Sequence, residues 1–185
     1  MGERHDVIAL LRKRSVSHGE FLLASGKKSV YYIDARRATM SAEGQALLGP
    51  AGLNAIRAAG WAPASVGGLT MGADPVAYAI ARASIEAPPT IDAFSVRKDP
   101  KAHGTGRRIE GVFEPGTPVV LIEDVITTGG SALKAAEALR EEGAAILGIL
   151  AVVDREEGGR QRLEGEGYAV VVLTTTTDLL REVVV

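Results

Sequence analysis

Two adjacent acidic residues, Glu123 and Asp124, stand just before a turn rich in threonine and glycine, Thr127–Ser131. The acids follow the short apolar run Pro118–Ile122, which is typical of a strand covered on both faces in a parallel sheet. We therefore expect both carboxylates to emerge at the carboxyl end of a strand, where open α/β sheets bind ligands. Glycines let the backbone approach a ligand closely, and the free N–H groups at the start of the next helix, residues 132–142, can hold a phosphate.

The acids and the turn suit different parts of one ligand. A pair of carboxylates repels phosphate, but it accepts hydrogen bonds from a diol and can hold a hydrated Mg²⁺. The pattern therefore predicts a sugar phosphate, with its hydroxyls on Glu123 and Asp124 and its phosphate on the Thr-Gly turn. No G-x-x-x-x-G-K-[ST] motif occurs, and the run Gly67–Gly72 does not fit G-x-G-x-x-G. An ordinary strand–loop–helix turn would explain neither adjacent charges at a buried strand end nor two glycines before a helix.

A second concentration of charge lies in residues 97–108. Glycines, a proline and the lack of any apolar period indicate a mobile surface loop. So dense a cationic loop in a chain of net charge −2 favours a polyanion such as pyrophosphate. A solvated basic loop or a weak nucleic-acid contact would have the same composition. Against the single acid Asp99, the loop carries Arg97, Lys98, Lys101, His103, Arg107 and Arg108.

Length and composition limit the class of protein. With 185 residues and 46% hydrophobic content, the chain can bury a substantial core as one domain. A net charge of −2 and 4% aromatic residues do not favour a general nucleic-acid or membrane-surface binder. The absence of cysteine excludes disulfides, thiolate nucleophiles and cysteine zinc sites, and it fits a reducing compartment, so we expect a cytoplasmic protein. No apolar signal core or membrane-spanning segment is evident.

The order of apolar segments predicts the fold. A helix near residues 7–14 and a hairpin of residues 21–24 and 30–33 come first; Tyr31 and Tyr32 alternate on its second strand, so one should pack and the other face a ligand. A helix capped by Ser41 ends at Gly60, and a second helix, capped and started by Asp74-Pro75, runs to about residue 84. Strands are expected at 65–69, 91–96, 118–122, 146–153 and 169–173. These βα units predict a doubly wound, mostly parallel α/β sheet in a single domain, residues 1–185. Residues 1–40 should form the N-terminal helix and a small hood over the ligand edge.

Five segments resemble one enzyme family. The stretch from Val119 to Ser131 resembles the phosphoribosyl-pyrophosphate (PRPP) motif of the type I phosphoribosyltransferases: apolar residues, two acids, an apolar pair and T-T-G-G-S. Four others resemble the orotate phosphoribosyltransferases, in the right order along nearly the whole chain. They are F-L-L-A-S-G-K-K-S-V-Y-Y-I-D at 21–34, G-G-L-T-M-G-A-D-P at 67–75, R-K-x-x-K-x-H-G at 97–104 and V-V-D-R at 152–155.

The resemblance implies a Mg²⁺-dependent pentosyltransferase of pyrimidine (UMP) biosynthesis. Such an enzyme transfers the phosphoribosyl group of PRPP to N1 of orotate, giving orotidine 5′-monophosphate and pyrophosphate. Departure of pyrophosphate leaves an oxocarbenium-like ribose, so catalysis depends on neutralising the leaving group and positioning the base. The resemblance also implies a homodimer with shared active sites, because in this family the closing loop serves the neighbouring subunit. From charge and composition, we expect no nucleic-acid or membrane partner.

Residue roles follow from the same resemblance. Glu123 and Asp124 would hold the ribose hydroxyls, and residues 125–131 the 5′-phosphate. Arg97 and Lys98 would face pyrophosphate, and Lys101 and His103 would close over the reacting bond. The implied catalytic residues are Lys101, His103 and Asp124. The implied PRPP-binding residues are Arg97, Lys98, Lys101, His103, Glu123, Asp124, Val125, Ile126, Thr127, Thr128, Gly129, Gly130 and Ser131. Mg²⁺ would be held mainly through PRPP, with Asp124 as the candidate protein ligand.

Orotate would contact Thr127 and Arg155. A guanidinium fork suits a carboxylate, although on local grounds Arg155 could equally be a strand-end arginine paired with Asp154 or Glu156. The chain also departs from the family pattern. Ala24 stands where many members have a lysine, and a second common lysine is missing near Met71-Gly72; Lys27 or Lys28 is a candidate to supply the charge.

Two alternative functions remain open from the sequence. The first is a phosphoribosyltransferase for a purine or another base, whose hood would differ and which would not be expected to carry K-x-H-G in the loop. The second is a non-catalytic regulator that senses PRPP and binds nucleic acid. Such a regulator should show a basic docking face or an added helix-turn-helix, and neither is evident in the sequence.

Overall fold

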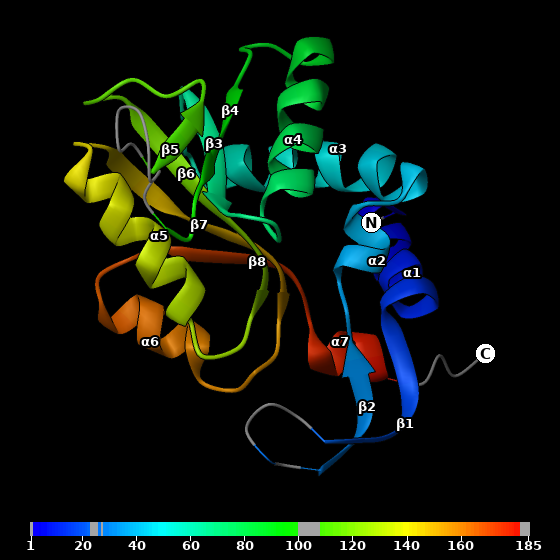
Figure 1. Ribbon diagram of the computed structural model, residues 1–185. Coiled ribbons are helices and arrows are strands. Elements are labelled where there is room, and N and C mark those ends of the chain that lie inside the picture. The colour runs from blue at the N-terminus through cyan, green and yellow to red at the C-terminus, as the bar shows by residue number, and fades with distance from the viewer. Residues whose placement is uncertain (1, 23–25, 27, 100–107, 182–185) are drawn as a thin grey trace.

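The computed structural model describes residues 2–22, 26, 28–99 and 108–181. Within these ranges, a six-stranded sheet in the order β5-β4-β3-β6-β7-β8 is accompanied by a separate two-stranded hairpin, β1-β2 (Figure 1). Only β5 pairs antiparallel within the larger sheet. The sheet comprises β3 (Ser65–Leu69), β4 (Asp92–Val96), β5 (Ile109–Gly111), β6 (Pro118–Ile126), β7 (Ala145–Asp154) and β8 (Val170–Thr175). The predicted mostly parallel α/β fold is confirmed.

Helices cover both faces of the sheet because β6 is apolar on both faces. Val120 and Ile122 join one buried core with α3 (Ala42–Ala58) and α4 (Asp74–Glu86). Val119 and Leu121 join a second core with α5 (Gly130–Glu141) and α6 (Gly159–Gly165). Alternation of side chains along a strand produces this division. Figure 1 shows α5 and α6 on one side of the sheet, and α3 and α4 on the other.

Most predicted element positions agree with the structure, and Ser41 caps α3 by accepting a hydrogen bond from the Gly44 amide at 3.0 Å. The prediction that Asp74 caps the next helix is wrong, because the N-cap of α4 is Ala73. The Asp74 carboxylate instead accepts a hydrogen bond at 2.7 Å from the hydroxyl of Ser95 on β4. Burial raises the pKa of Asp74, and the Ser95 hydrogen bond opposes that shift.

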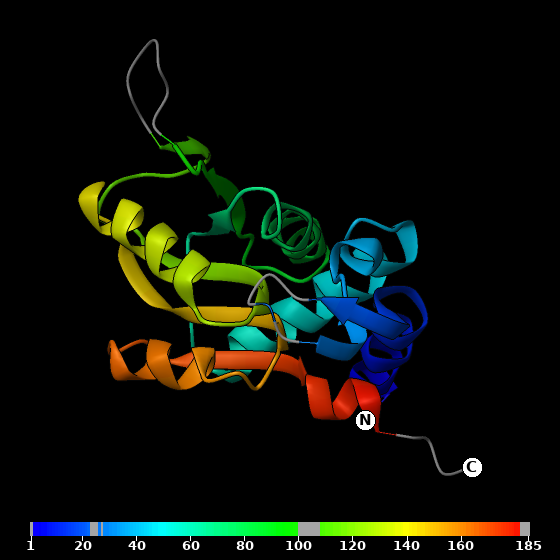
Figure 2. The ribbon, with the colours of Figure 1, turned by 60° about the horizontal axis from the view of Figure 1, so that its bottom comes forward.

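An N-terminal helix and a hairpin occur as predicted, but the first strand of the hairpin begins five residues earlier than the expected 21–24, and residues 23–25 lie outside the described residues. Helix α1 (Gly2–Ser15) continues directly into β1 (Val16–Leu22), which pairs antiparallel with β2 (Lys28–Ile33), and the short α2 (Arg36–Thr39) follows. The hairpin stands apart from the six-stranded sheet in both ribbon views (Figures 1 and 2). In both views α1 lies beside α7 (Thr176–Leu180), which the sequence did not predict, and the two helices are in contact. No helix in the described ranges is long and apolar enough to cross a membrane.

Candidate active site

A cavity of about 230 Å³ brings several of the predicted site residues together. Its walls come from the β3–α4 loop, the residues after β4, the end of β6, the first turn of α5 and the helix α2. Of the predicted residues, Lys98, Glu123, Asp124 and Ser131 line it. The complete lining is Arg36, Leu69, Thr70, Met71, Gly72, Lys98, Glu123, Asp124 and Ser131.

The acidic pair lies within strand β6 and near its carboxyl end, so the predicted end of the strand at Ile122 is wrong. The strand continues to Ile126, and Glu123 pairs in register with Ala151 of β7. Glu123 is only 6% exposed. Burial, and then the negative charge of Asp124, raise the pKa of the Glu123 carboxyl well above its ordinary value. Because successive side chains of a strand point to opposite faces, the neighbouring Asp124 has a different environment and is half-buried.

The Asp124 carboxylate is held between its own backbone and the β3–α4 loop. Its Oδ1 atom accepts a hydrogen bond at 2.9 Å from the amide of Val125. A Cβ atom added at Gly72 would lie 2.5 Å from the same oxygen, so a larger residue there would displace the carboxylate. Gly72 is therefore a site residue that the sequence analysis missed, because the contact joins two segments far apart in the chain.

The Thr-Gly turn (residues 127–131) leads into α5 through a left-handed N-cap, Gly129, with φ of 75°. The first N–H groups of a helix have no partner within it, and the positive end of the helix dipole adds to their attraction for an anion. Val125 and Ile126, predicted to share the phosphate site, belong to β6, where they pair with Val153 and Asp154. Ile126 is buried in the core, and its carbonyl accepts a hydrogen bond from the Arg155 amide.

Helix α6 supports the Thr-Gly turn from below. A Cβ atom added at Gly159 would lie 2.2 Å from the carbonyl oxygen of Thr127, so only glycine permits this approach. Arg162 donates a hydrogen bond at 3.2 Å to the carbonyl of Thr128. The sequence analysis missed both residues. The Gly158-Gly159 pair was the available signal, because adjacent glycines before a short helix indicate close backbone packing.

The predicted cations do not all lie at the cavity. Lys98 lines it, whereas the guanidinium of Arg97 lies 3.9 Å from the carboxylate of Glu110 and is not part of the lining. Lys101 and His103 lie outside the described residues. Arg36, which the sequence analysis missed, lines the cavity and pairs with Asp34 at 2.9 Å. The hydrogen bond and charge of Asp34, with a smaller effect of Asp124, raise the Arg36 pKa.

The lysine substitutes proposed for the hood receive no support at the cavity. Lys28 is an exposed residue at the start of β2 and does not line the cavity. Lys27 and Ala24 lie outside the described residues. The second missing lysine would fall near Met71 and Gly72, which do line the cavity.

Arg155 lies beside the Thr-Gly turn. Because Ile126 pairs with Asp154, the next residues of the two strands, Thr127 and Arg155, begin side by side. The Arg155 side chain is 8% exposed and pairs with Glu157 at 2.8 Å, so neither partner considered from the sequence, Asp154 or Glu156, is the observed one. Its Nε atom is buried and has no hydrogen-bond partner among the residues that the structure describes.

An aromatic ring of the hood faces Arg155. The guanidinium carbon lies 5.9 Å from the centre of the Tyr31 ring. Tyr32 points to the other face of the hairpin, where its ring centre lies 5.7 Å from that of Phe21. The two tyrosines thus lie on opposite faces of the hairpin, with Tyr31 half-buried against the core and turned toward Arg155. That one of them faces a ligand stays a prediction.

Comparison with known proteins identifies close relatives. Residues 54–179 match the family model described as a phosphoribosyl transferase domain. The chain is 46% identical over 183 residues to the orotate phosphoribosyltransferase of Aquifex aeolicus, covering 97% of this chain and 99% of that protein. The crystal structure of the Mycobacterium tuberculosis H37Rv orotate phosphoribosyltransferase in complex with Fe(III) dicitrate matches with a TM-score of 0.84 at 43% identity. The match covers 97% of this chain and 99% of that chain. The PRPP complex of the M. tuberculosis enzyme matches with a TM-score of 0.79 at 39% identity, covering 96% and 98%.

Proposed function

The chain belongs to the phosphoribosyltransferase family and, within it, to the orotate phosphoribosyltransferases, and from this membership we propose that it transfers the phosphoribosyl group of PRPP to orotate. The products are orotidine 5′-monophosphate and pyrophosphate. The observation that carries the proposal is the cavity that unites Glu123 and Asp124 with Lys98 and the first turn of α5. The carboxylates can accept hydrogen bonds from a ribose diol, the lysine can pair with pyrophosphate, and the helix start can bind a 5′-phosphate.

The acidic pair would receive the ribose of PRPP. Asp124, already oriented by the Val125 amide, accepts a hydrogen bond from one ribose hydroxyl. Glu123 is costly to ionise where it is buried, and a second hydroxyl that donates to it offsets part of this cost. The 5′-phosphate would then lie on the free N–H groups at the start of α5, which Gly159 and Arg162 support from α6.

The bond between C1′ and the pyrophosphate oxygen breaks as the bond between C1′ and N1 of orotate forms, and the electron pair leaves with pyrophosphate. Lys98 and Arg36 lie where they can neutralise this charge, and we assign Lys101 and His103 of the adjoining loop to the same task. Arg97 would have to leave its contact with Glu110 to take part. No protein nucleophile is required.

Mg²⁺ is part of the proposal as a partner of PRPP. No group of three or more His, Asp or Glu side chains able to hold a metal occurs in the described ranges. Asp124 is the half-exposed carboxylate of the cavity, and we assign it as the protein's contribution, with the remaining oxygens from PRPP and water. When bound, the ion neutralises part of the pyrophosphate charge. Removal of Mg²⁺ with EDTA should abolish turnover, and added Mg²⁺ should restore it.

Orotate would bind between the hood and the ends of β6 and β7. The buried guanidinium of Arg155 can donate two parallel hydrogen bonds to the carboxylate of orotate. The Tyr31 ring, which faces the guanidinium, helps to fix its orientation. Thr127 starts beside Arg155 and provides a hydroxyl at the same end of the sheet. Binding of orotate would require the Arg155–Glu157 ion pair to loosen, because Glu157 already occupies part of the fork.

We also propose a homodimer with shared sites, located in the cytoplasm. The support for an interface is α4, where Tyr78 and Ile85 are 52% and 64% exposed and lie seven residues apart, hence on one face of the helix. Large apolar side chains grouped in this way favour contact with another protein surface. The absence of cysteine fits a reducing compartment.

The test is a turnover assay. Protein mixed with PRPP, Mg²⁺ and orotate should consume orotate, followed as the loss of its absorbance, and Asp124→Ala should be inactive in the same assay. Turnover with a purine base instead of orotate would favour the first alternative function. Binding of PRPP without turnover of any base would favour the PRPP-sensing regulator.

A further inference from the structure

Glu156, directly after Arg155, has an unusual backbone conformation. Its φ of 58° makes it the one non-glycine residue with positive φ among those that the structure describes. L side chains rarely adopt this region, and it persists where the surroundings impose it. The conformation determines the path of the chain directly after Arg155.

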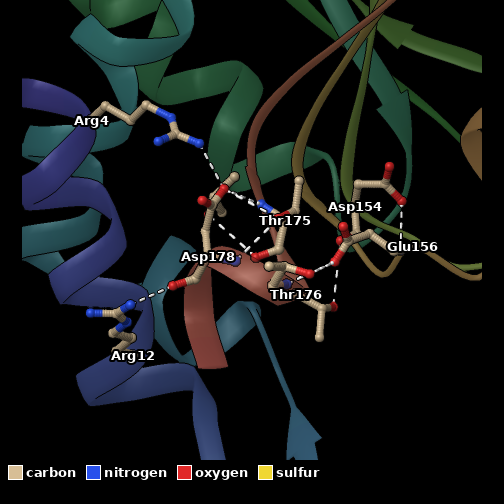
Figure 3. Close-up of polar contacts among 9 residues, drawn as sticks. Arg4, Arg12, Asp154, Glu156, Thr175, Thr176 and Asp178 are labelled. Carbon is tan, nitrogen blue, oxygen red and sulfur yellow. Dashed lines mark hydrogen bonds and ion pairs between the residues drawn. The ribbon is translucent and has the colours of Figure 1, made fainter. Parts of the chain in front are cut away.

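Hydrogen bonds at both ends of the residue hold this conformation (Figure 3). The Glu156 amide donates to Oδ1 of Asp154 at 2.8 Å. Its Oε2 atom accepts from both the amide and the hydroxyl of Thr177, each at 2.7 Å. Thr177 lies in the first turn of α7, so the turn that presents Arg155 is attached to this short helix.

The other end of α7 is attached to the hood helix α1. Arg12 donates to the carbonyls of Leu179 and Arg181 at 3.0 and 2.7 Å, and to that of Asp178. A cation at the last carbonyls of a helix is also favoured by the helix dipole. Arg4 adds an ion pair with Asp178 at 2.6 Å (Figure 3).

These contacts form a closed circuit around the orotate site. From Arg155 it passes through Glu156 and α7 to Arg12 in α1. Helix α1 continues into β1, which pairs with β2, the strand that carries Tyr31. The ring of Tyr31 then meets Arg155 again at 5.9 Å. We propose that Glu156 is a positioning residue for orotate, which through α7 holds Tyr31 and Arg155 at their working separation. The inference rests on the proposed function, because it assigns Arg155 and Tyr31 to the orotate site.

Loss of the Glu156 contacts is expected to change the relative placement of Tyr31 and Arg155 without detaching the hood from the core. Helix α1 also packs against α3, and Val7, Leu10 and Leu11 are buried in the main core. The hood therefore remains docked when Glu156 is changed. The proposed contacts with the ribose and the 5′-phosphate lie on β6 and α5, outside the circuit, and of the described lining residues only Arg36 of α2 adjoins the hood, so binding of PRPP should depend little on Glu156.

Glu156→Gly is the decisive variant, because glycine keeps the positive φ while the carboxylate is lost. We expect the KM for orotate to rise about tenfold and that for PRPP to change by less than about twofold, a size typical of a disturbed positioning contact. Glu156→Gln keeps an acceptor oxygen and should recover most of the loss. The matched control is Glu164→Gln, which removes an exposed acid from α6 and should leave both constants unchanged.

A second variant tests the far end of the circuit. Arg12→Ala should also raise the KM for orotate, and combining it with Glu156→Gly should add little, because both changes break the same connection. An unchanged KM for orotate in Glu156→Gly would overturn the inference. So would equal rises for orotate and PRPP accompanied by a lower Tm, since these indicate a general structural role. Failure of the unmodified protein to consume orotate would instead refute the proposed function.

Discussion

At the scale of single residues, the site depends on two adjacent acids that occupy different environments. Glu123 is buried and hard to ionise, whereas Asp124 is half-buried and oriented by a backbone amide. The sequence alone does not show this difference in burial. The difference arises because the strand continues through them: Glu123 pairs with Ala151 inside the sheet, whereas Asp124 contacts the β3–α4 loop at Gly72. We assign both to the ribose, where a donor hydroxyl reduces the cost of charge on Glu123.

The buried carboxyl predicts a specific pH dependence of stability. Its pKa in the unfolded chain is near 4.5 and is higher in the folded protein, so above pH 4.5 the folded protein binds more protons than the unfolded chain. The contribution of Glu123 to the free energy of unfolding therefore falls as the pH rises from 4.5 through the raised pKa. Glu123→Gln removes this effect, so its stability relative to the unmodified protein, measured by urea unfolding, should increase as the pH rises above 4.5. A difference independent of pH would refute the assignment, and Glu164→Gln provides an exposed control.

At the scale of elements, α6 contacts the Thr-Gly turn although it contributes no expected contact with PRPP. Gly159→Ala should force the Thr127 carbonyl away, because the added methyl group would lie 2.2 Å from that oxygen. We expect the KM for PRPP to rise about tenfold or more, together with a lower Tm. Gly165→Ala is the matched control on the same helix, since nothing lies within 4 Å of its added methyl group. Equal kinetics for the two variants would show that α6 does not position the turn.

Sequence patterns predicted the long elements better than the short ones. The apolar runs at 65–69 and 146–153 are nearly coincident with β3 and β7, because buried strands leave a continuous apolar signal. Helices α6 and α7 span seven and five residues, too few for an apolar period to develop. The end of β6 was placed too early because Glu123 and Asp124 resemble a strand boundary. Asp74 was expected to cap α4, but tertiary contact with Ser95 determines its position.

The candidate site was predictable where its residues follow one another in sequence. The acids and the Thr-Gly turn were found because one strand–turn–helix segment contains them. Gly72 and Gly159 were missed because each approaches a residue far away in the chain, and Arg36 was missed because the cavity that it lines is assembled from distant segments. Propensity and spacing carry no information about such contacts, which depend on how the β3–α4 loop, α2 and α6 approach β6.

At the scale of the whole molecule, the proposed sharing of sites between subunits has a direct consequence. In a hybrid dimer of Lys101→Ala and Asp124→Ala chains, one site would contain both defects and the other neither. Mixing the two inactive proteins should therefore restore part of the activity, measured as orotate consumption after the chains have exchanged. Hybrids that demonstrably form but stay inactive would show that each subunit uses its own loop.

The central claim is that the acids of β6 and the start of α5 bind opposite ends of one ribose 5-phosphate. A crystal structure of the protein with PRPP and Mg²⁺ tests it most directly. The account predicts ribose hydroxyls within hydrogen-bond distance of Glu123 and Asp124, and the 5′-phosphate on the amides at the start of α5. A ribose bound elsewhere, or a Thr-Gly turn that remains free of phosphate at saturating PRPP, would contradict it.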